Sequence, residues 1–172
     1  MYDVSGNDRV EELKAVPQSC TGAPMPVVIA DEFHVLLAYL TSQPDPNWDG
    51  SYVNVVTTDT ESVVAIVTFS RPSLHMFGPP NDEAFDGHPL AKSGLRPYSA
   101  NEIHNSSWRQ RRIAMNRVHR QHSDSMFDDL RHFIFAFHDS TFECLAHGFD
   151  VSLFRGSMQG AVAHMASLAA EW

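Results

Sequence analysis

Histidines and a glutamate alternate with aromatic residues along residues 131–147, which read RHFIFAFHDSTFECLAH. Side chains of a strand alternate between the two faces of its sheet, so a hairpin with a two-residue turn at Asp139-Ser140 would pair Phe137 with Phe142. This register predicts one fully apolar face. The opposite face would carry four polar side chains, and they define the first candidate site: His132, His138, Glu143 and His147.

In this register His138 lies one diagonal step from Glu143, within reach of a long carboxylate side chain. A carboxylate that accepts a hydrogen bond from an imidazole fixes its tautomer and raises its basicity, as in a general acid/base pair. We therefore expect His138 and Glu143 as candidate catalytic residues, with His132 as a ligand contact. The alternative is structural, because a buried pair of this kind also satisfies its own hydrogen bonds without any substrate.

The second candidate site is the loop from His75 to His88, HMFGPPNDEAFDGH, which gathers two imidazoles, three carboxylates and one carboxamide. The expected ligand-binding residues of this loop are Asn81, Asp82, Glu83 and His88. A divalent metal is possible, because imidazole nitrogen and carboxylate oxygen suit such ions, and its candidate ligands are His75, Asp82 and His88. Alternatively these side chains cap local turns, since their spacing matches no established metal motif.

Two other chemistries are excluded by local geometry. Ser140 lies beside His138 and Asp139, but neighbours in a tight turn cannot align a nucleophile, a base and an orienting carboxylate, and no G-x-S-x-G motif is present. Gly78-Pro79-Pro80 is not a phosphate-binding loop, because proline lacks the backbone N–H that cradles a phosphate. Neither an acyl-transfer triad nor a nucleotide-binding loop is therefore expected.

The net negative charge of the chain limits the classes of macromolecule that it is expected to bind. The chain has 12 Lys and Arg against 21 Asp and Glu, and the net charge of −9 opposes non-specific attraction to nucleic acid or anionic lipid. One predicted helix is nevertheless basic, through Arg109, Arg111, Arg112, Arg117 and Arg120. A surface for an acidic partner is one interpretation, but we favour a solvated helix face whose arginines pair with nearby acids. Nucleic acid is not an expected partner.

Cysteine usage and hydropathy indicate the compartment. The only cysteines are Cys20 and Cys144, so a disulfide framework is not supported and a reduced compartment is the simpler interpretation. We see no secretory signal, and no apolar run approaches the roughly 20 residues that a bilayer requires. We therefore expect a cytoplasmic protein without a membrane segment, and its oligomeric state is left open.

The elements that must position these residues predict an α+β fold with a mainly antiparallel β-sheet. Strands are expected where β-branched and aromatic residues dominate, at 26–30, 33–40, 51–57, 61–70 and 74–77, before the hairpin. Short connections between strands leave no room for parallel crossovers. At 172 residues, with 43% hydrophobic and 19% charged residues, the chain fits one domain with a substantial core.

Two helices complete the predicted fold. One is expected at about 107–119, where Ser107 and Gln110 have the capping-box spacing, and one at about 157–171, where apolar residues recur at helical spacing. A long ordered loop is expected at about 78–98, with Phe85, Leu90 and Leu95 as apolar anchors.

The domain is expected to begin near residue 25. Residues 1–24 are interpreted as a flexible N-terminal arm with a short helix from Arg9 to Val16, which Pro17 would end, and residues 25–172 as a single α+β domain.

Two functions of different classes follow from these residues. The leading hypothesis is an enzyme or binding protein whose small polar ligand lies between the 75–88 loop and the polar face of the hairpin. The alternative is a non-catalytic protein-interaction protein with structural histidines, in which the loop and the basic helix bind an acidic partner. A concave pocket that joins the loop to the hairpin favours the first, and a flat exposed surface around Trp108 favours the second.

Overall fold

The elements of the chain are nine strands and two α-helices, as seen in a computed structural model that describes residues 2–42, 51 and 55–172. The strands are β1 (Arg9–Glu12), β2 (Val27–Ala30), β3 (Val35–Leu40), β4 (Ser62–Ser70), β5 (Leu74–Gly78), β6 (Ala100–His104), β7 (Arg131–Ala136), β8 (Thr141–Ala146) and β9 (Gly148–Gly156). The helices are α1 (Ser107–Asn116) and α2 (Met158–Ala169), and short 3₁₀ turns lie at Phe85–Gly87, Ala91–Ser93 and Asp124–Phe127.

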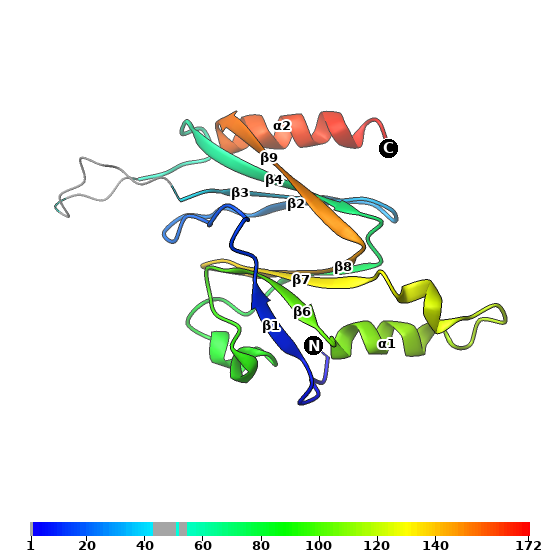
Figure 1. The fold of residues 1–172 in the computed structure, drawn as a ribbon. Helices are drawn as coiled ribbons and strands as arrows, with labels where there is room; N and C mark the ends of the chain where they lie inside the picture. Colours follow the sequence, from blue (N-terminus) through cyan, green and yellow to red (C-terminus); the bar gives the residue numbers. More distant parts are fainter. Residues whose placement is uncertain (1, 43–50, 52–54) are drawn as a thin grey trace.

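The strands form two antiparallel sheets that pack face to face. One sheet has the order β1-β6-β7-β8-β5 and the other β2-β3-β4-β9. Figure 1 shows the resulting layers, with α2 on the outer face of the four-stranded sheet and α1 on the outer side of the five-stranded sheet. Because both sheets are covered on both faces, β3 and β8 are buried along their whole length.

Three apolar clusters hold these layers together. Between the sheets, aromatic residues of β7 and β8 meet Tyr39 and Phe69 of the opposite sheet. Under α2, Met158, Ala161 and Met165 pack on β3 and β4, as the helical spacing predicted. The third cluster lies on the outer face of the five-stranded sheet and includes the predicted loop anchors Phe85, Leu90 and Leu95, which are 3%, 0% and 1% exposed.

The α+β prediction is confirmed, and both helices form near their predicted positions. Ser157 caps α2 by accepting a hydrogen bond from the Gly160 amide. The N-cap of α1 is Ser106 rather than the predicted Ser107, because the Ser107 hydroxyl is bonded to Asp8 instead. In the described part of the chain, no helix is long and apolar enough to cross a bilayer.

Three strands were missed. The sequence predicted a helix from Arg9, but residues 9–12 are β1, paired with β6 along one edge of its sheet. The segment expected to be a flexible arm is thereby packed on the domain, with the Tyr2 side chain only 5% exposed. The missed strands β1, β6 and β9 mix polar and charged residues with apolar ones, and β6 buries the polar Asn101, which hides the strand signal in the sequence. Of the predicted strand at 51–57, residues 52–54 lie outside the described residues and 55–57 are not in a strand.

The β7–β8 hairpin has the predicted faces but a different register. Phe135 pairs with Phe142 and Phe133 with Cys144, a shift of two residues from the prediction. The loop therefore contains four residues, Phe137 to Ser140, and the Phe137 amide donates to the Ser140 carbonyl at 2.8 Å. A two-residue turn of the favoured type requires positive φ at both central positions, and neither Asp139 nor Ser140 adopts it. A shift of two residues keeps every side chain on its predicted face but changes its neighbours.

Candidate functional site

The register places Glu143 beside His132 instead of His138. Glu143 lies opposite Ile134 on β7, one diagonal step from His132, while His138 is displaced into the hairpin loop. The predicted His138–Glu143 pair is therefore wrong. His147 also leaves the polar face, since it follows β8 and its Nδ1 lies 2.6 Å from an Arg71 nitrogen.

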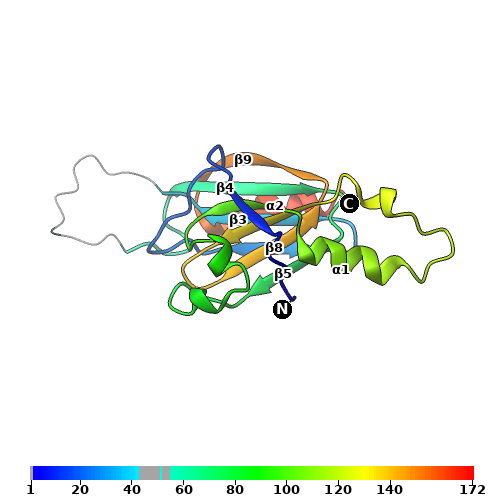
Figure 2. The same ribbon diagram turned by 60° about the horizontal axis from the view of Figure 1, so that its bottom comes forward.

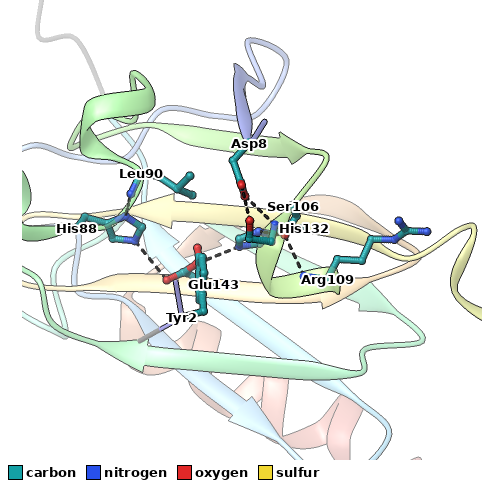
Figure 3. A network of polar contacts seen from close by, with 9 residues as sticks. Tyr2, Asp8, His88, Leu90, Ser106, Arg109, His132 and Glu143 are labelled. Atoms are coloured by element: carbon teal, nitrogen blue, oxygen red, sulfur yellow. Dashed lines mark hydrogen bonds and ion pairs between the residues drawn. The ribbon is translucent and has the colours of Figure 1, made fainter. Parts of the chain in front are cut away.

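Glu143 is the centre of a buried network built from four distant segments (Figure 3). The Tyr2 hydroxyl donates to Glu143 Oε2 at 2.6 Å, and His132 Nε2 lies 2.9 Å from the same oxygen. His88 Nε2, from the long loop, lies 3.3 Å from Oε1. Trp108 of α1 stacks on Tyr2 with ring centroids 5.4 Å apart, and it contacts His132 edge-on. The network thus connects the N-terminal segment, the loop, α1 and the hairpin.

Hydrogen bonding assigns the protons in this network. The Leu90 amide donates to His88 Nδ1 at 3.1 Å, so Nδ1 is unprotonated and Nε2–H donates to Glu143. Ser106 Oγ accepts from the Arg109 amide and lies 2.8 Å from His132 Nδ1. An ionised carboxylate can only accept, so His132 Nε2–H donates to Glu143, and Nδ1 of the neutral imidazole accepts from the Ser106 hydroxyl. Glu143 then accepts three hydrogen bonds as an ionised carboxylate among neutral donors.

The pKa shifts agree with this assignment. Burial raises the pKa of Glu143, but the hydrogen bonds from His132 and His88 outweigh it and lower that pKa to about 2. Burial lowers the pKa of His132 more than the Glu143 carboxylate raises it, so the imidazole is neutral at pH 7. Burial and the nearby Glu143 charge raise the pKa of Tyr2, so the phenol keeps its proton.

This network is closed to ligands. The His88 and His132 side chains are 0% exposed and the Glu143 side chain is 4% exposed. A general base must come within hydrogen-bond distance of the proton it removes, and the Glu143 oxygens are occupied and covered. The geometry supports the structural interpretation of these three residues, which is the alternative that the sequence left open.

Acidification is expected to weaken the fold through His132. Its pKa is lowered in the folded state, so the neutral form is favoured there, and the unfolded chain takes up a proton once the pH falls below the ordinary value of about 6.5. The free energy of unfolding should therefore fall as the pH drops below about 6.5, by at most about 1.4 kcal/mol per pH unit. The Glu143 contribution, present above its unfolded pKa, persists there and is lost only as the pH falls through about 2.

Urea denaturation at several pH values measures this dependence. The slope should flatten in His132→Gln and stay unchanged in His119→Gln, which alters an exposed histidine beyond α1. An equal slope in His132→Gln and the wild type would contradict the assignment to His132.

The second polar cluster is accessible, and it joins the long loop to the hairpin loop. Asp82 and Tyr98 come from the two ends of the long loop, and His138 comes from the hairpin. The Asp82 amide donates to the His138 carbonyl at 2.8 Å, and the Thr141 hydroxyl donates to the Pro80 carbonyl at 3.0 Å. These contacts hold the two loops side by side, with the His138 side chain 40% exposed.

The three polar side chains of this cluster contact one another. The Tyr98 hydroxyl donates to Asp82 Oδ2, and His138 Nδ1 lies 2.8 Å from the Tyr98 oxygen and 3.0 Å from Asp82 Oδ2. Because the phenol proton is used toward Asp82, His138 Nδ1 must be the protonated nitrogen. His138 Nε2 is 3.9 Å from Asp139, too far for a hydrogen bond, so this contact does not block Nε2 from a ligand.

The carboxylate and the phenol also shift each other's pKa. The hydrogen bond from Tyr98 lowers the pKa of Asp82, and the contact with His138 lowers it further. The same Asp82 hydrogen bond raises the pKa of Tyr98 to about 12. At neutral pH the cluster therefore contains a carboxylate, a neutral phenol and an imidazole whose tautomer the carboxylate fixes, as in an acid/base pair.

A pocket of about 220 Å³ lies next to this cluster. Segment 12–19 covers it, and its floor is formed by Tyr39 and by residues 98–100 and 135–137, at the start of β6 and the end of β7. Tyr98 lines this pocket and also bonds to Asp82 and His138. The pocket therefore reaches the hairpin and the end of the long loop, although residues 75–88 do not line it.

The other predicted site residues are dispersed. Asn81 accepts a hydrogen bond from the Ala84 amide as a turn cap, and Glu83 is exposed. His75 lies on β5, where it stacks on Phe142, away from the buried His88. In the described ranges, no group of three or more His, Cys, Asp or Glu side chains could hold a metal ion, so the metal candidates His75, Asp82 and His88 do not form a site.

The basic helix supports the solvated interpretation only in part. Arg109 donates to the Phe127 carbonyl, and Arg112 lies over the Phe127 ring and donates to Ser73. Arg117 pairs with Asp124. These arginines hold the segment that follows α1 against the domain. Trp108, the expected centre of a flat interface, is only 7% exposed.

Sequence reasoning missed Tyr2 and Tyr98. Tyr2 lies in the segment interpreted as an arm, and Tyr98 ends a long loop of turn-forming residues, so no periodic pattern marks either one. A comparison of the chain with protein-family profiles, curated proteins and solved structures finds no match.

Proposed function

We propose that this protein binds a small polar ligand in the pocket under segment 12–19, and that the Tyr98–Asp82–His138 cluster exchanges a proton with it. One observation carries the proposal: Tyr98 is both a wall of the pocket and a hydrogen-bond partner of Asp82 and His138. It joins a cavity to groups that can transfer a proton, which is the combination expected of a binding or catalytic site.

Each residue of the cluster has a distinct part. Asp82 accepts hydrogen bonds from Tyr98 and from His138 Nδ1, which orients the imidazole. His138 is the proton acceptor through its free Nε2. Tyr98 connects the pocket to the cluster, because its oxygen can hold an acidic ligand group by a hydrogen bond. The proton of that group reaches His138 at Nε2 through water, since Nδ1 already carries a proton.

The lining of the pocket indicates the ligand class. Its volume of about 220 Å³ is below the roughly 300–1,000 Å³ typical of drug-sized ligands. Aromatic side chains of Tyr39, Phe135 and Phe137 form an apolar floor, while Glu12 and Lys14 supply one charge of each sign at the cover. A small ligand with an apolar body and an ionisable group fits this surface.

Calorimetry of small phenols, carboxylic acids and amides tests this proposal. A compound that binds the wild type should exchange protons with the buffer, which appears as a binding enthalpy that depends on the ionisation enthalpy of the buffer. We expect this exchange to disappear in His138→Gln and to persist in His119→Gln.

The pocket itself is tested by amide chemical shifts. A bound compound should shift the NMR signals of Val16, Ala100 and Phe137, which line the cavity. If no compound binds, or if binding exchanges no proton in the wild type, the proposed function is wrong.

A further inference from the structure

The two sheets have four edge strands, and one of them is unlike the others. The edges β1, β2 and β5 have four, four and five residues, and β5 is flanked by Pro72 and Pro79. The remaining edge, β9, has nine residues. Proteins usually keep edge strands short or interrupt them, because a long edge presents unpaired N–H and C=O groups to any other strand.

Strand β9 has few of the features that protect an edge. It pairs with β4 over all nine residues on one side, and in the described residues no backbone bond from any other segment reaches it. Figure 2 shows it at the open rim of its sheet. The strand contains no proline or lysine, only Asp150 and Arg155 carry charges, and the Leu153 side chain is 56% exposed.

We propose that β9 is a dimerisation edge, on which β9 of a second copy of this chain pairs in antiparallel orientation. A two-fold axis perpendicular to the sheet pairs residues that lie on the same face. If the axis passes through Ser152, all nine residues pair, and Gly148 of one copy lies opposite Gly156 of the other. In this register Leu153 of each copy lies opposite Val151 of the other copy. Both pairs are on the face that packs on the five-stranded sheet. The two four-stranded sheets become one continuous eight-stranded sheet.

The charges on β9 do not oppose a second copy as the occupant. Asp150 and Arg155 cancel, so the strand itself carries no net charge toward an identical strand. An antiparallel strand is self-complementary about a two-fold axis, and such dimers are the commonest oligomers. The net charge of −9 on each chain opposes association at a distance, so the dimer should become tighter as salt is added.

Sedimentation velocity of the full chain between about 1 and 100 µM tests the association. We expect a dimer in this range, and Leu153→Lys should weaken it by at least about 10-fold, because an edge lysine resists strand pairing. Val118→Lys is the matched control, since Val118 is 92% exposed beyond α1, and it should leave the dimer unchanged. A wild type that stays monomeric throughout, or a dimer that Leu153→Lys does not affect, overturns the proposal.

Cysteine cross-linking tests the register independently, in a Cys20→Ser background because Cys144 is buried. Ser152→Cys places the two sulfurs across the axis, where opposed Cα atoms are about 4.5–5.5 Å apart and a disulfide can form. Asp150→Cys is the control, because the two copies would then be four residues apart along the strand, about 13 Å. Rapid oxidation of Ser152→Cys alone supports the register, and equal oxidation of both variants contradicts it.

Discussion

Phe135→Ala is expected to lower the free energy of unfolding by about 3–5 kcal/mol. Phe135 lies on β7 between the two sheets and is 2% exposed. Its ring contacts four other aromatic rings, with centroid distances between 5.9 and 6.4 Å: Tyr39, Phe69, Phe142 and Phe149. Removing it leaves a cavity that two sheets, each fixed by its own hydrogen bonds, cannot close.

Urea denaturation followed by fluorescence measures the loss, and Phe33→Ala is the matched control. Phe33 lies in the turn between β2 and β3 and is 69% exposed, so its truncation should cost less than about 1 kcal/mol. Equal costs for the two phenylalanines would mean that Phe135 does not lie between the sheets.

Glu143→Gln is expected to lower the free energy of unfolding by about 3 kcal/mol, although it changes only one oxygen into an amide nitrogen. The carboxylate accepts from Tyr2, His132 and His88, all of which are buried donors. A glutamine offers one acceptor oxygen and turns an N–H₂ group toward the remaining donors, and each buried polar group left unpaired costs about 1–3 kcal/mol.

Tyr2→Phe is the matched control for this prediction. It removes one of the three donors and keeps the ring that stacks on Trp108, so it should cost about 1 kcal/mol. In the double variant the two losses of unfolding free energy should not add, because Glu143→Gln has already removed the carboxylate that the Tyr2 hydroxyl contacts. Full additivity, or a Glu143→Gln protein as stable as the wild type, would contradict the network.

The sequence by itself determined the elements with strong periodic signals and the faces of the central hairpin. The spacing of Phe133, Phe135 and Phe137, two residues apart, predicts an apolar face, and these rings do lie between the sheets. The apolar face of α2 follows in the same way from the helical spacing of its apolar residues. These features depend on residues close together in the chain, so local patterns suffice to predict them.

Only the tertiary structure decided which polar groups meet. A shift of two residues in the strand register leaves every side chain on the same face of the sheet. The sequence therefore could not distinguish a register in which Glu143 contacts His138 from one in which it contacts His132. The four-residue loop of the hairpin sets the observed register. It moved His138 out of the sheet toward Asp82 and Tyr98, which separates an accessible proton-transfer cluster from a buried network.

The partners of both clusters come from segments without periodicity. Tyr2 lies 141 residues before Glu143, and Tyr98 lies 40 residues before His138. Contacts over such separations depend on how whole sheets and loops pack. They leave no local pattern of residue types, so composition and spacing identified the histidines and carboxylates of this protein, and packing alone determined which of them are open to a ligand.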